Sequence, residues 1–414
     1  MRVLLMSYRG NPYCGGQGIY LFYLTRELAK LGVKIDILVG PPYPDPLDEW
    51  GKTYKVENLN IWSVRTRHLP LEKLKKIYSP FNFLDYLLTR FHIFSEMQTF
   101  SFRAFFLIKK ILKKKKYDLI HDIQSLGWGL LPLKLFGIPI ITTVHHPLTK
   151  DREADLMVDK SLWEKITTLL FYPLGMQSFV IKKLNRVITS FEAGVEELHK
   201  AFKINKKKIS VVYNGLDVEA FQNNGQPREE NSLLFVGNTE DHKKGLIFLF
   251  QALQMLPNQV TLTIVDEGPP AKITAQNLIK KFNLEHRVFF TGKVDQLKLI
   301  HLYSTKTILV MSSLYEGFGL PAAEAMACQT PVVATKVGAL KEVVPEGAGL
   351  LVPDKDPQAL KEAILKLLND KELRTKMGLK GREHVTQNFS WTVAAQKTLD
   401  VYQEVIKKHR GNLK

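Results

Sequence analysis

The segment Tyr315–Val333 (YEGFGLPAAEAMACQTPVV) holds the residues best suited to chemistry in this 414-residue chain. Glu316 follows an apolar run typical of a buried strand, and Pro321 opens a predicted helix that carries Glu324 near its start. Free N–H groups at a helix start can receive an anion such as a diphosphate, and carboxylates accept hydrogen bonds from hydroxyl groups. The ordinary preference of acidic residues for helix N-termini explains Glu324 but not Glu316 or the turn Gly317–Gly319. The segment therefore predicts a binding site for an anion that also bears hydroxyls.

A second candidate is the glycine loop Cys14–Gly18 (CGGQG), between a predicted strand and a predicted helix. Glycines there let backbone N–H groups and the positive helix end approach a phosphate, but a plain tight turn explains them equally well. A nicotinamide site is disfavoured because the G-x-G-x-x-G spacing is absent and no acidic residue follows Val39–Gly40 to hold a ribose.

His145 ends the predicted strand Pro139–Val144, within the sequence HHP. From the residues alone, a histidine at a strand end is more often a satisfied polar residue than a catalytic one. Cys14 and Cys328 are far apart and outside any metal-ligand spacing, so we expect packing residues and no disulfide or zinc site.

Short β-rich runs alternate with helical stretches, which predicts an α/β chain with mostly parallel sheets covered on both faces. The first forty residues predict a strand (Arg2–Ser7), a helix (about Ile19–Leu31) and a strand (Val33–Val39). The further expected strands are Tyr117–His121, Pro139–Val144, Arg186–Ser190, Ile209–Tyr213, Leu233–Gly237, Val260–Gly268, Val288–Gly292, Ile308–Ser313, Pro331–Thr335 and Gly349–Val352.

The lysine cluster and turn around Lys206–Asn214 predict a domain boundary near residue 208. We expect domains at 1–208 and 209–389, and a last helix from Phe389 to Lys408. Ligands of open parallel sheets bind beyond the carboxyl ends of strands, so two facing sheets would hold a cleft between them.

The composition is typical of a folded globular chain, with 45% apolar and 24% charged residues. The first ten residues predict a buried strand rather than a signal peptide, and Pro173, Gly175 and Gln177 interrupt the apolar stretch Ile166–Ile181, so no membrane-spanning helix is expected. These features favour a cytoplasmic protein.

The net charge of +17 is concentrated in residues 51–150, which hold 17 Lys and Arg against 6 Asp and Glu. Residues 84–116 of this block also carry leucines and phenylalanines at helical spacing and end in Lys113–Lys116. One interpretation is two core-facing helices, the second ended by lysines that suit its negative C-terminus. The other is a basic amphipathic surface that docks on an anionic membrane. Nucleic acid is disfavoured because no recognised motif accompanies the charge.

The sequence resembles the retaining, nucleotide-sugar-dependent glycosyltransferases of family 4, which have the GT-B architecture of two facing Rossmann-like domains. The resemblance implies that the last helix crosses back, so that 390–414 belongs with the first domain. The likeness extends over nearly the whole chain, and its hallmark is the pair Glu316-x7-Glu324. The other segments that carry it are the N-terminal glycine loop, Asn214–Asp217 (NGLD), Phe235–Gly245 (FVGNTEDHKKG), Ala348–Val352 and Phe389–Trp391 (FSW).

The resemblance implies roles for residues of the second domain. Glu324 would hold the ribose hydroxyls of the donor and Glu316 would contact the donor sugar, while Lys244 would neutralise the diphosphate leaving group. The backbone N–H groups beside sugar and phosphate would be those of Phe318, Gly319 and Leu320. A cation and helix N-termini stabilise a departing diphosphate without a metal, so neither metal nor cofactor is expected.

In the first domain, the resemblance implies that Gly16 presents its N–H to the same phosphate and that His145, rather than His146, lines the catalytic centre. Many relatives carry an arginine where this chain has Asn238, which can donate a hydrogen bond but supplies no charge. Lys243 or His242 could compensate for that missing charge.

The predicted function is therefore transfer of a sugar from a nucleotide diphosphate donor to a hydroxyl acceptor. We expect a lipid-linked or polysaccharide acceptor in cell-envelope or exopolysaccharide assembly, at the inner membrane face. The alternatives are a catalytically weak nucleotide-sugar-binding subunit, which Asn238 favours, and a nucleotide-sugar epimerase.

Overall fold

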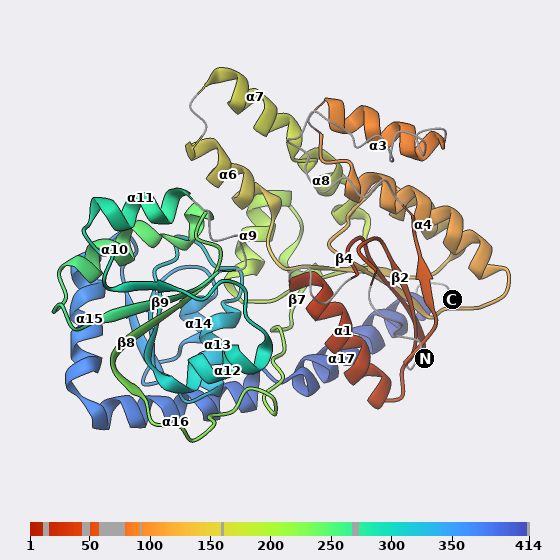
Figure 1. Cartoon of the computed structure of the whole chain (residues 1–414). Coiled ribbons are helices and arrows are strands. Elements are labelled where there is room, and N and C mark those ends of the chain that lie inside the picture. The colour runs from red at the N-terminus through yellow and green to blue at the C-terminus, as the bar shows by residue number, and fades with distance from the viewer. Residues whose placement is uncertain are drawn as a thin grey trace. The chain divides into compact units, whose positions relative to one another are not determined.

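The computed structural model describes residues 1–10, 16–43, 50–57, 79–91, 93–158, 161–266 and 273–411 (Figure 1). The chain divides into two compact units: unit 1 is Met1–Gly215 with Ala394–Lys414, and unit 2 is Leu216–Val393. Each unit is built on one parallel sheet, so the predicted α/β class is confirmed. The tip of the glycine loop, residues 11–15 with Cys14, lies outside the described residues.

Unit 1 contains a seven-stranded parallel sheet in the order β3-β2-β1-β4-β5-β6-β7. Its strands are β1 (Arg2–Ser7), β2 (Lys34–Val39), β3 (Thr53–Lys55), β4 (Leu119–Ile123), β5 (Ile140–Val144), β6 (Arg186–Thr189) and β7 (Ile209–Val211). Its helices are α1 (Gly16–Lys30), α3 (Pro80–Arg90), α4 (Glu96–Leu112), α5 (Leu130–Leu133), α6 (Leu148–Val158), α7 (Leu162–Phe171), α8 (Leu174–Lys183), α9 (Ala193–Phe202) and most of α17 (Trp391–Gly411). The strand order reverses between β1 and β4, which is where ligands of such sheets bind.

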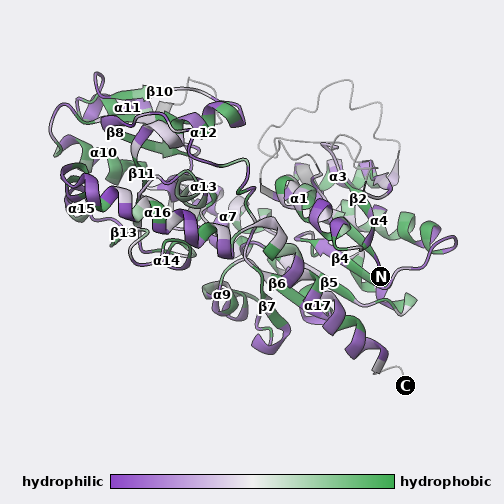
Figure 2. Cartoon of the chain, turned by 90° about the horizontal axis from the view of Figure 1, so that it is seen from below, coloured by the Kyte–Doolittle hydropathy of each residue, from purple (hydrophilic) through white to green (hydrophobic). Residues whose placement is uncertain are grey.

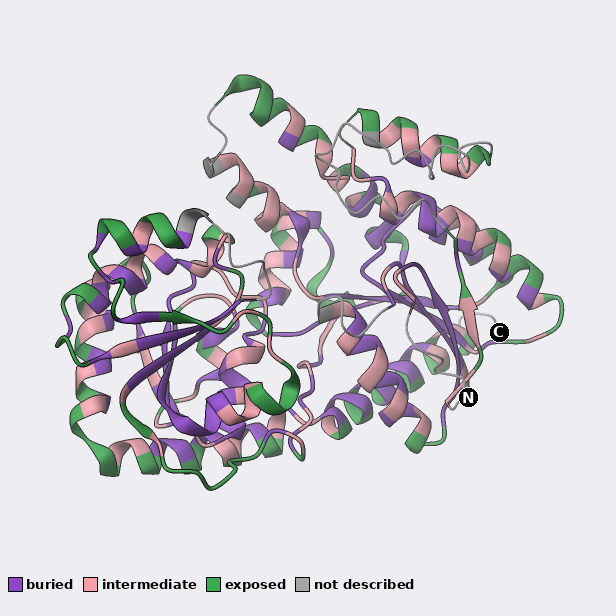
Figure 3. Ribbon diagram, in the orientation of Figure 1, coloured by how far each residue is buried: buried purple, intermediate pink, exposed green. Residues whose placement is uncertain are grey.

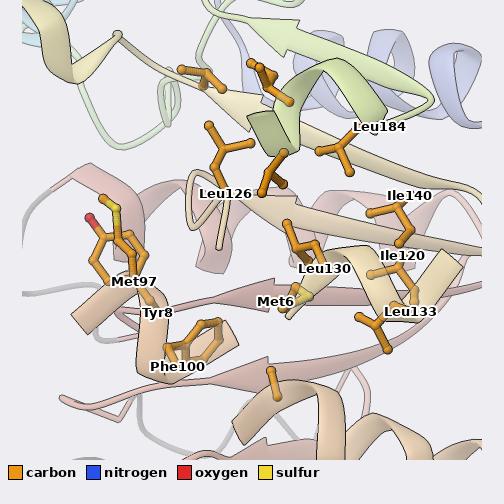
Figure 4. Close-up of a cluster of buried hydrophobic side chains, with 14 of the residues drawn as sticks. Met6, Tyr8, Met97, Phe100, Ile120, Leu126, Leu130, Leu133, Ile140 and Leu184 are labelled. Atoms are coloured by element: carbon orange, nitrogen blue, oxygen red, sulfur yellow. The ribbon is translucent and has the colours of Figure 1, made fainter. Parts of the chain in front are cut away.

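Alternate residues of β1 pack on opposite faces of this sheet, as the period of two requires. Leu4 and Met6 join a core with Phe100 of α4 and Leu130 of α5 (Figure 4). The other face of the sheet is covered by α1 and α17 (Figure 1). Strands buried on both faces consist almost entirely of apolar residues, and Figure 2 shows many of them in green.

One strand assignment from the sequence is wrong. We expected Ile209–Tyr213 to start the second sheet, but β7 pairs in parallel with β6 and forms the edge of the first. A three-residue strand does not itself encode which sheet it joins, because partner strands supply its hydrogen bonds. The sequence analysis also missed β3, which pairs with β2 at the opposite edge.

Unit 2 contains a six-stranded parallel sheet in the order β10-β9-β8-β11-β12-β13. Its strands are β8 (Glu229–Val236), β9 (Thr261–Val265), β10 (Val288–Phe290), β11 (Lys306–Met311), β12 (Val332–Thr335) and β13 (Gly349–Val352). Its helices are α10 (Leu246–Gln254), α11 (Ile273–Lys281), α12 (Gln296–Thr305), α13 (Leu320–Ala327), α14 (Leu340–Val343), α15 (Pro357–Asn369) and α16 (Lys371–Asn388). Cys328 is buried here, as expected of a packing residue.

The last helix begins in unit 2 and continues on unit 1, so the predicted crossing helix is confirmed. Ser390 caps it by accepting from the Val393 N–H at 3.3 Å. On unit 1, Tyr402 is fully buried and Arg410 pairs with Asp118 at 2.7 Å.

Residues 84–116 of the basic block lie mainly in α3 and α4. The inner side of α4 is core, with Met97, Phe100, Ala104 and Ile108 fully buried, as the core-facing interpretation predicts. Phe83, Leu87 and Phe91 along α3 and Phe106 of α4 remain exposed. In the described part of the chain no helix is both long and apolar enough to cross a membrane.

Candidate active site

The candidate residues of unit 2 lie on two loops that leave adjacent strands. The sheet order reverses between β8 and β11, and the loops that follow these strands carry Lys244 and Glu316. Carboxyl ends of parallel strands meet at one edge, so residues 72 positions apart in sequence come together there.

Lys244 and Glu316 form an ion pair, with Lys244 Nζ 2.8 Å from Glu316 Oε2. Their side chains keep 20% and 13% of their surface exposed, so the pair can still reach a ligand. Ser313 Oγ also lies 3.4 Å from the same carboxylate oxygen. This arrangement offers a cation for an anionic group and a carboxylate for hydroxyls.

The loop that carries Lys244 is fixed on both sides. A short 3₁₀ turn, His242–Lys244, is capped by Asp241, whose side chain accepts from the Lys243 N–H at 3.0 Å. Gly245 follows with φ +60°, and a Cβ there would lie 2.1 Å from the Ser312 carbonyl oxygen. Ser312 Oγ donates to the Lys244 carbonyl at 3.0 Å. Only glycine permits this close approach, which joins the two loops.

Gly319 and Leu320 form the start of α13. Gly319 has φ +91°, and a Cβ on it would meet Leu340 Cδ2 at 2.7 Å. Leu320 and Pro321 begin the helix, whose first turn contains no acidic side chain to offset its positive end. Phe318 is nearly fully buried and packs edge-on against Phe389, with ring centroids 5.3 Å apart. The backbone of this turn, and not the Phe318 ring, is therefore what a ligand could contact.

Glu324 lies in the second turn of α13, where one of its carboxylate oxygens accepts a hydrogen bond from Tyr303 Oη at 2.7 Å. Burial raises the pKa of this carboxyl to about 7, and the Tyr303 hydrogen bond acts in the opposite direction. Among the described residues, no hydrogen bond to the other oxygen, Oε1, is present. That oxygen can accept from a ligand hydroxyl.

Asn238 is exposed, and its side-chain oxygen accepts from the Glu240 N–H at 3.0 Å. The oxygen thus stabilises a local turn. The next residue, Thr239, fixes the loop to β9 through Asp266, with 2.5 Å between Thr239 Oγ1 and Asp266 Oδ2.

In unit 1, Gly16 is the first residue of α1, at the reversal point after β1. The first turn of α1 contains no acidic residue, so its positive end is not offset locally. The next residue, Gln17, donates to Tyr8 Oη at 3.1 Å, while its own side-chain oxygen is buried and has no hydrogen-bond partner among the described residues.

His145 follows β5 directly, and its ring meets the Tyr20 ring of α1 edge-on with centroids 4.7 Å apart. Both ring nitrogens are buried. The Asn214 side chain interacts with the ring and raises its pKa, but within the described residues neither ring nitrogen meets a partner at full hydrogen-bond geometry, and Asn214 Oδ1 does not either. Burial, with the nearby His146, lowers the pKa of His145 to about 4, so the ring is neutral at physiological pH. Buried polar atoms are nearly always paired, so these atoms fit a place where a ligand completes the hydrogen bonding.

His146 makes a different contact. Its Nε2 lies 2.8 Å from Asp151 Oδ2. His146 has a well-formed partner in Asp151, whereas the His145 ring has only the weaker contact with Asn214. The geometry therefore favours His145 as the ligand-facing residue.

A buried polar chain runs beneath His145. His121 contacts Tyr402 Oη through Nδ1 and Thr143 Oγ1 through Nε2, both at 2.7 Å. Tyr20 Oη lies 3.3 Å from the same Thr143 hydroxyl. Burial lowers the pKa of His121 to about 3, so the chain is uncharged. It joins α17 to the tyrosine that packs on His145.

Sequence reasoning missed several residues of these sites. Gln124 is held at φ +55°, and its side chain accepts from the His145 N–H and donates to the His146 carbonyl, both at 3.1 Å. Tyr303 and Tyr20 look like core tyrosines in the sequence. They differ from ordinary core tyrosines only in that each hydroxyl has a polar partner in the tertiary structure. In the described ranges, no three His, Cys, Asp or Glu side chains are grouped so as to hold a metal ion.

Comparison with known proteins identifies the family. The family description "Glycosyltransferase Family 4" matches residues 14–220, and "Glycosyl transferases group 1" matches residues 217–384. The chain belongs to the group 1, family 4 glycosyltransferases.

One relative is the MMP alpha-(1->4)-mannosyltransferase of Mycolicibacterium hassiacum, 32% identical over 98% of both chains. Another is the D-inositol 3-phosphate glycosyltransferase of Kineococcus radiotolerans, 26% identical over 98% of this chain and 95% of the relative.

Solved structures show the same fold. The sucrose-phosphate synthase of Thermosynechococcus elongatus matches with a TM-score of 0.75 and 26% identity over 99% of this chain and 100% of that one. Anabaena HepE in complex with UDP and glucose matches with a TM-score of 0.71 and 18% identity over 98% and 100%. The predicted GT-B fold class is confirmed.

Proposed function

We propose that this glycosyltransferase moves a sugar from a nucleotide diphosphate donor to a hydroxyl acceptor with retention of anomeric configuration. The observation that carries the proposal is the Lys244–Glu316 ion pair beside the start of α13. Departure of a nucleoside diphosphate builds negative charge, which a fixed cation and a helix N-terminus stabilise. Lys244 binds the diphosphate, and Glu316 accepts from hydroxyls of the donor sugar.

The remaining contacts of unit 2 hold the nucleotide. The free oxygen of Glu324 accepts from the ribose hydroxyls while Tyr303 holds the other oxygen. The N–H groups of Phe318, Gly319 and Leu320 bind sugar and phosphate oxygens. Charge neutralisation by Lys244 and the helix start serves the leaving group, and no metal ion or cofactor takes part in the proposal.

In unit 1, the N–H of Gly16 binds the diphosphate and the neutral ring of His145 bonds to the donor sugar. The lowered pKa of His145, about 4, supports a role as a hydrogen-bonding group rather than as a charged acid. We assign no protein base. The leaving phosphate takes the acceptor proton as the acceptor oxygen attacks the anomeric carbon from the same face.

The acceptor we propose is a lipid-linked glycan or a polysaccharide, in cell-envelope or exopolysaccharide assembly on the cytoplasmic side of the membrane. The name of the Mycolicibacterium relative, a mannosyltransferase, supports mannose as the first donor sugar to test. The names of both relatives support transfer to a hydroxyl.

A binding subunit without catalysis is the second candidate, because Asn238 supplies no charge where many relatives have arginine. The intact Lys244–Glu316 pair argues against it. An epimerase would use the same nucleotide site without an acceptor, and its product would be a free sugar or an altered donor.

The test is to incubate the purified chain with the uridine, guanosine and adenosine diphosphate derivatives of glucose and mannose, with and without detergent-solubilised membrane lipids. Nucleotide release is followed by chromatography, and the anomeric configuration of the product by NMR. We expect release from one donor, stimulated by lipid, with an α-linked product from an α-donor. Binding of nucleotide without release from any donor would favour the subunit, with Asn238→Arg as the next variant. An inverted product would exclude the retaining mechanism.

A further inference from the structure

Helix α7 has its apolar side chains on the outside. Leu162, Trp163 and Leu170 expose 76%, 64% and 54% of their surface, and Leu169 and Ile166 are exposed as well. The buried residue described on this helix is Thr168. Figure 3 shows α7 mostly in the green of exposed residues. Amphipathic helices of globular domains bury the opposite face, so α7 requires a partner for its apolar side.

This exposure does not reflect a weakly formed helix. Ser161 and Glu164 make a complete capping box, in which the Ser161 side chain accepts from the Glu164 N–H and the Glu164 side chain accepts from the Ser161 N–H. The helix stops at Phe171, two residues before Pro173. The ends of the helix are therefore fixed independently of its apolar side.

Helix α3 repeats the pattern. Phe83 and Leu87 are exposed at a spacing of four residues, and Phe91 continues the stripe. Asp85 is buried instead, where it bonds to Thr99 at 2.5 Å and to Arg103 at 3.1 Å.

The two helices adjoin at their C-terminal ends. The Phe94 N–H donates to the Phe171 carbonyl at 2.9 Å, and the two rings lie 5.4 Å apart. Phe106 of α4 extends the surface, since its ring lies 5.7 Å from Phe81 at the start of α3. We call this surface the α3–α7 face. Its exposed apolar residues are Phe83, Leu87, Phe91, Phe106, Leu162, Trp163, Ile166, Leu169 and Leu170.

The charge around the α3–α7 face is mostly positive. Exposed acidic residues are also present, and the examples on α7 and α6 are both engaged: Glu164 in the α7 capping box, and Glu153 with Lys150 at 3.1 Å. Between residues 79 and 136 the sequence has four acidic residues, and each has a protein partner. These partners are Arg103 for Asp85, Arg9 for Glu96, Arg410 for Asp118, and Ser125 and Thr142 for Asp122. The exposed basic residues nearby are Arg90, Lys109, Lys110 and Lys165.

We propose that the α3–α7 face docks on an anionic lipid bilayer, with Trp163 and its apolar neighbours at the level of the head groups. Exposed Trp, Phe and Leu accompanied by Lys and Arg are typical of helices that lie in the interface plane. A second copy of the chain fits less well, because a two-fold contact would bring the same basic residues together. This inference rests on the proposed function in one respect: docking would bring the enzyme to a lipid-linked acceptor.

The α3–α7 face overlaps residues 84–116, the segment of the membrane interpretation in the sequence analysis, but it adds α7 and does not centre on the lysines. Lys113–Lys116 follow the far end of α4, whose 17 residues span about 25 Å at a rise of 1.5 Å per residue. Lys115 is also paired with Asp36 at 2.8 Å. We therefore expect these lysines to contribute less than the apolar residues of α7.

The experiment measures sedimentation of the full chain with vesicles of phosphatidylcholine alone or of phosphatidylcholine mixed with the anionic lipid phosphatidylglycerol, which gives the surface a negative potential. The test variant is Trp163→Ser with Leu170→Ser. The matched control is Leu297→Ser with Leu379→Ser, which removes two exposed leucines of unit 2. Since all four side chains are mainly exposed, we expect unchanged circular dichroism and thermal midpoints.

We expect the parent chain and the control to bind anionic vesicles equally, and the test variant to lose at least tenfold in partitioning. Neutralising Lys113–Lys116 to Gln should cost less than the test variant. Absence of binding by the parent chain, equal binding by the test variant, or a larger loss with the lysine variant would overturn the proposal. So would a dimer of the parent chain that the test variant abolishes, because the occupant would then be a second copy. Nucleotide release without vesicles, measured on the same samples, separates failure of docking from failure of the proposed transferase.

Discussion

The two parts of the proposed site differ in charge and in access to solvent. In unit 2, Lys244 and Glu316 form an ion pair that remains partly exposed on loops at a strand reversal. In unit 1, His121, Thr143 and Tyr402 are fully or almost fully buried and connected by hydrogen bonds without net charge. From this difference we infer that the two units have different roles. Unit 2 supplies the charge that stabilises the leaving group, and unit 1 supplies uncharged groups that hold His145 in position.

This comparison separates two kinds of polar residue. A partly exposed ion pair can exchange its protein partner for a ligand at little desolvation cost. In a buried, uncharged series of hydrogen bonds every polar group has a partner. Removing one member leaves the next group buried and unpaired. Substitutions in unit 2 should therefore act on catalysis, and those in the buried chain of unit 1 on stability.

The largest effect is expected for Lys244→Ala. Loss of the cation that faces the developing diphosphate charge should lower kcat by about 10²–10³-fold, the range found for removing one preorganised donor. Steady-state kinetics measure this change in kcat, with the nucleotide-sugar donor that the incubation test identifies. Lys280→Ala on α11, an exposed lysine of the same unit, is the control and should stay within twofold (about 0.4 kcal/mol). Equal rates for the two variants would remove Lys244 from the mechanism.

His145→Ala should lower kcat by about 10²-fold, near the lower end of the range for one hydrogen-bonding group. Because the pKa of His145 lies near 4, the ring is already neutral above pH 5 and its titration should leave no inflection between pH 5.5 and 8. The measurement is a pH–rate profile of the parent enzyme. An inflection in that range that disappears in His145→Ala would show that the ring acts in its charged form.

Tyr402→Phe tests the buried chain. It leaves His121 Nδ1 without a partner and should lower the free energy of unfolding of unit 1 by about 1–3 kcal/mol. Urea unfolding and hydrogen exchange of β4 and β5 amides measure this, with Tyr86→Phe on α3 as the control. A fall in kcat without a loss of stability would contradict the view that these buried hydrogen bonds act by stabilising the fold of unit 1.

The same chain predicts a pH dependence of stability. The pKa of His121 is lowered from 6.5 to about 3 in the folded protein, so the native ring stays neutral while the unfolded ring takes up a proton below pH 6.5. The contribution of the neutral ring is therefore complete above pH 6.5 and is lost as the pH falls toward 3.

The smallest effect concerns Glu324. With its pKa raised to about 7, the carboxylate that accepts from the ribose is largely protonated at pH 6. Nucleotide affinity should therefore fall by about tenfold from pH 8 to pH 6, as the binding-competent fraction falls. Calorimetry with a nucleoside diphosphate measures it. Tyr303→Phe removes a hydrogen bond that lowers this pKa, so the midpoint should move to higher pH, and an unmoved midpoint would exclude the role given to Tyr303.

Local patterns in the sequence predicted most of the fold. The alternation of apolar β-rich runs with helical stretches predicted the parallel sheets. Ser390, which stands before a segment of helical periodicity, predicted the start of the last helix. The failures are short edge strands such as β3 and β7. Three residues carry too little periodicity to identify a strand or to choose its sheet.

The candidate residues of unit 2 could be named from their types and spacing, because helix starts and glycine turns encode anion binding locally. The α/β class, the glutamate pair on either side of the start of α13 and the excess of positive charge can all be read from the residues in order. Other features appear only in the folded chain: Lys244 meets Glu316, Tyr303 holds Glu324, the buried ring nitrogens of His145 find no well-formed hydrogen bond among the described residues, and the apolar side of α7 lies outside. The physical reason is that each of these depends on which strands are neighbours and which face of a helix is covered. Such long-range contacts leave no periodic signal in the chain.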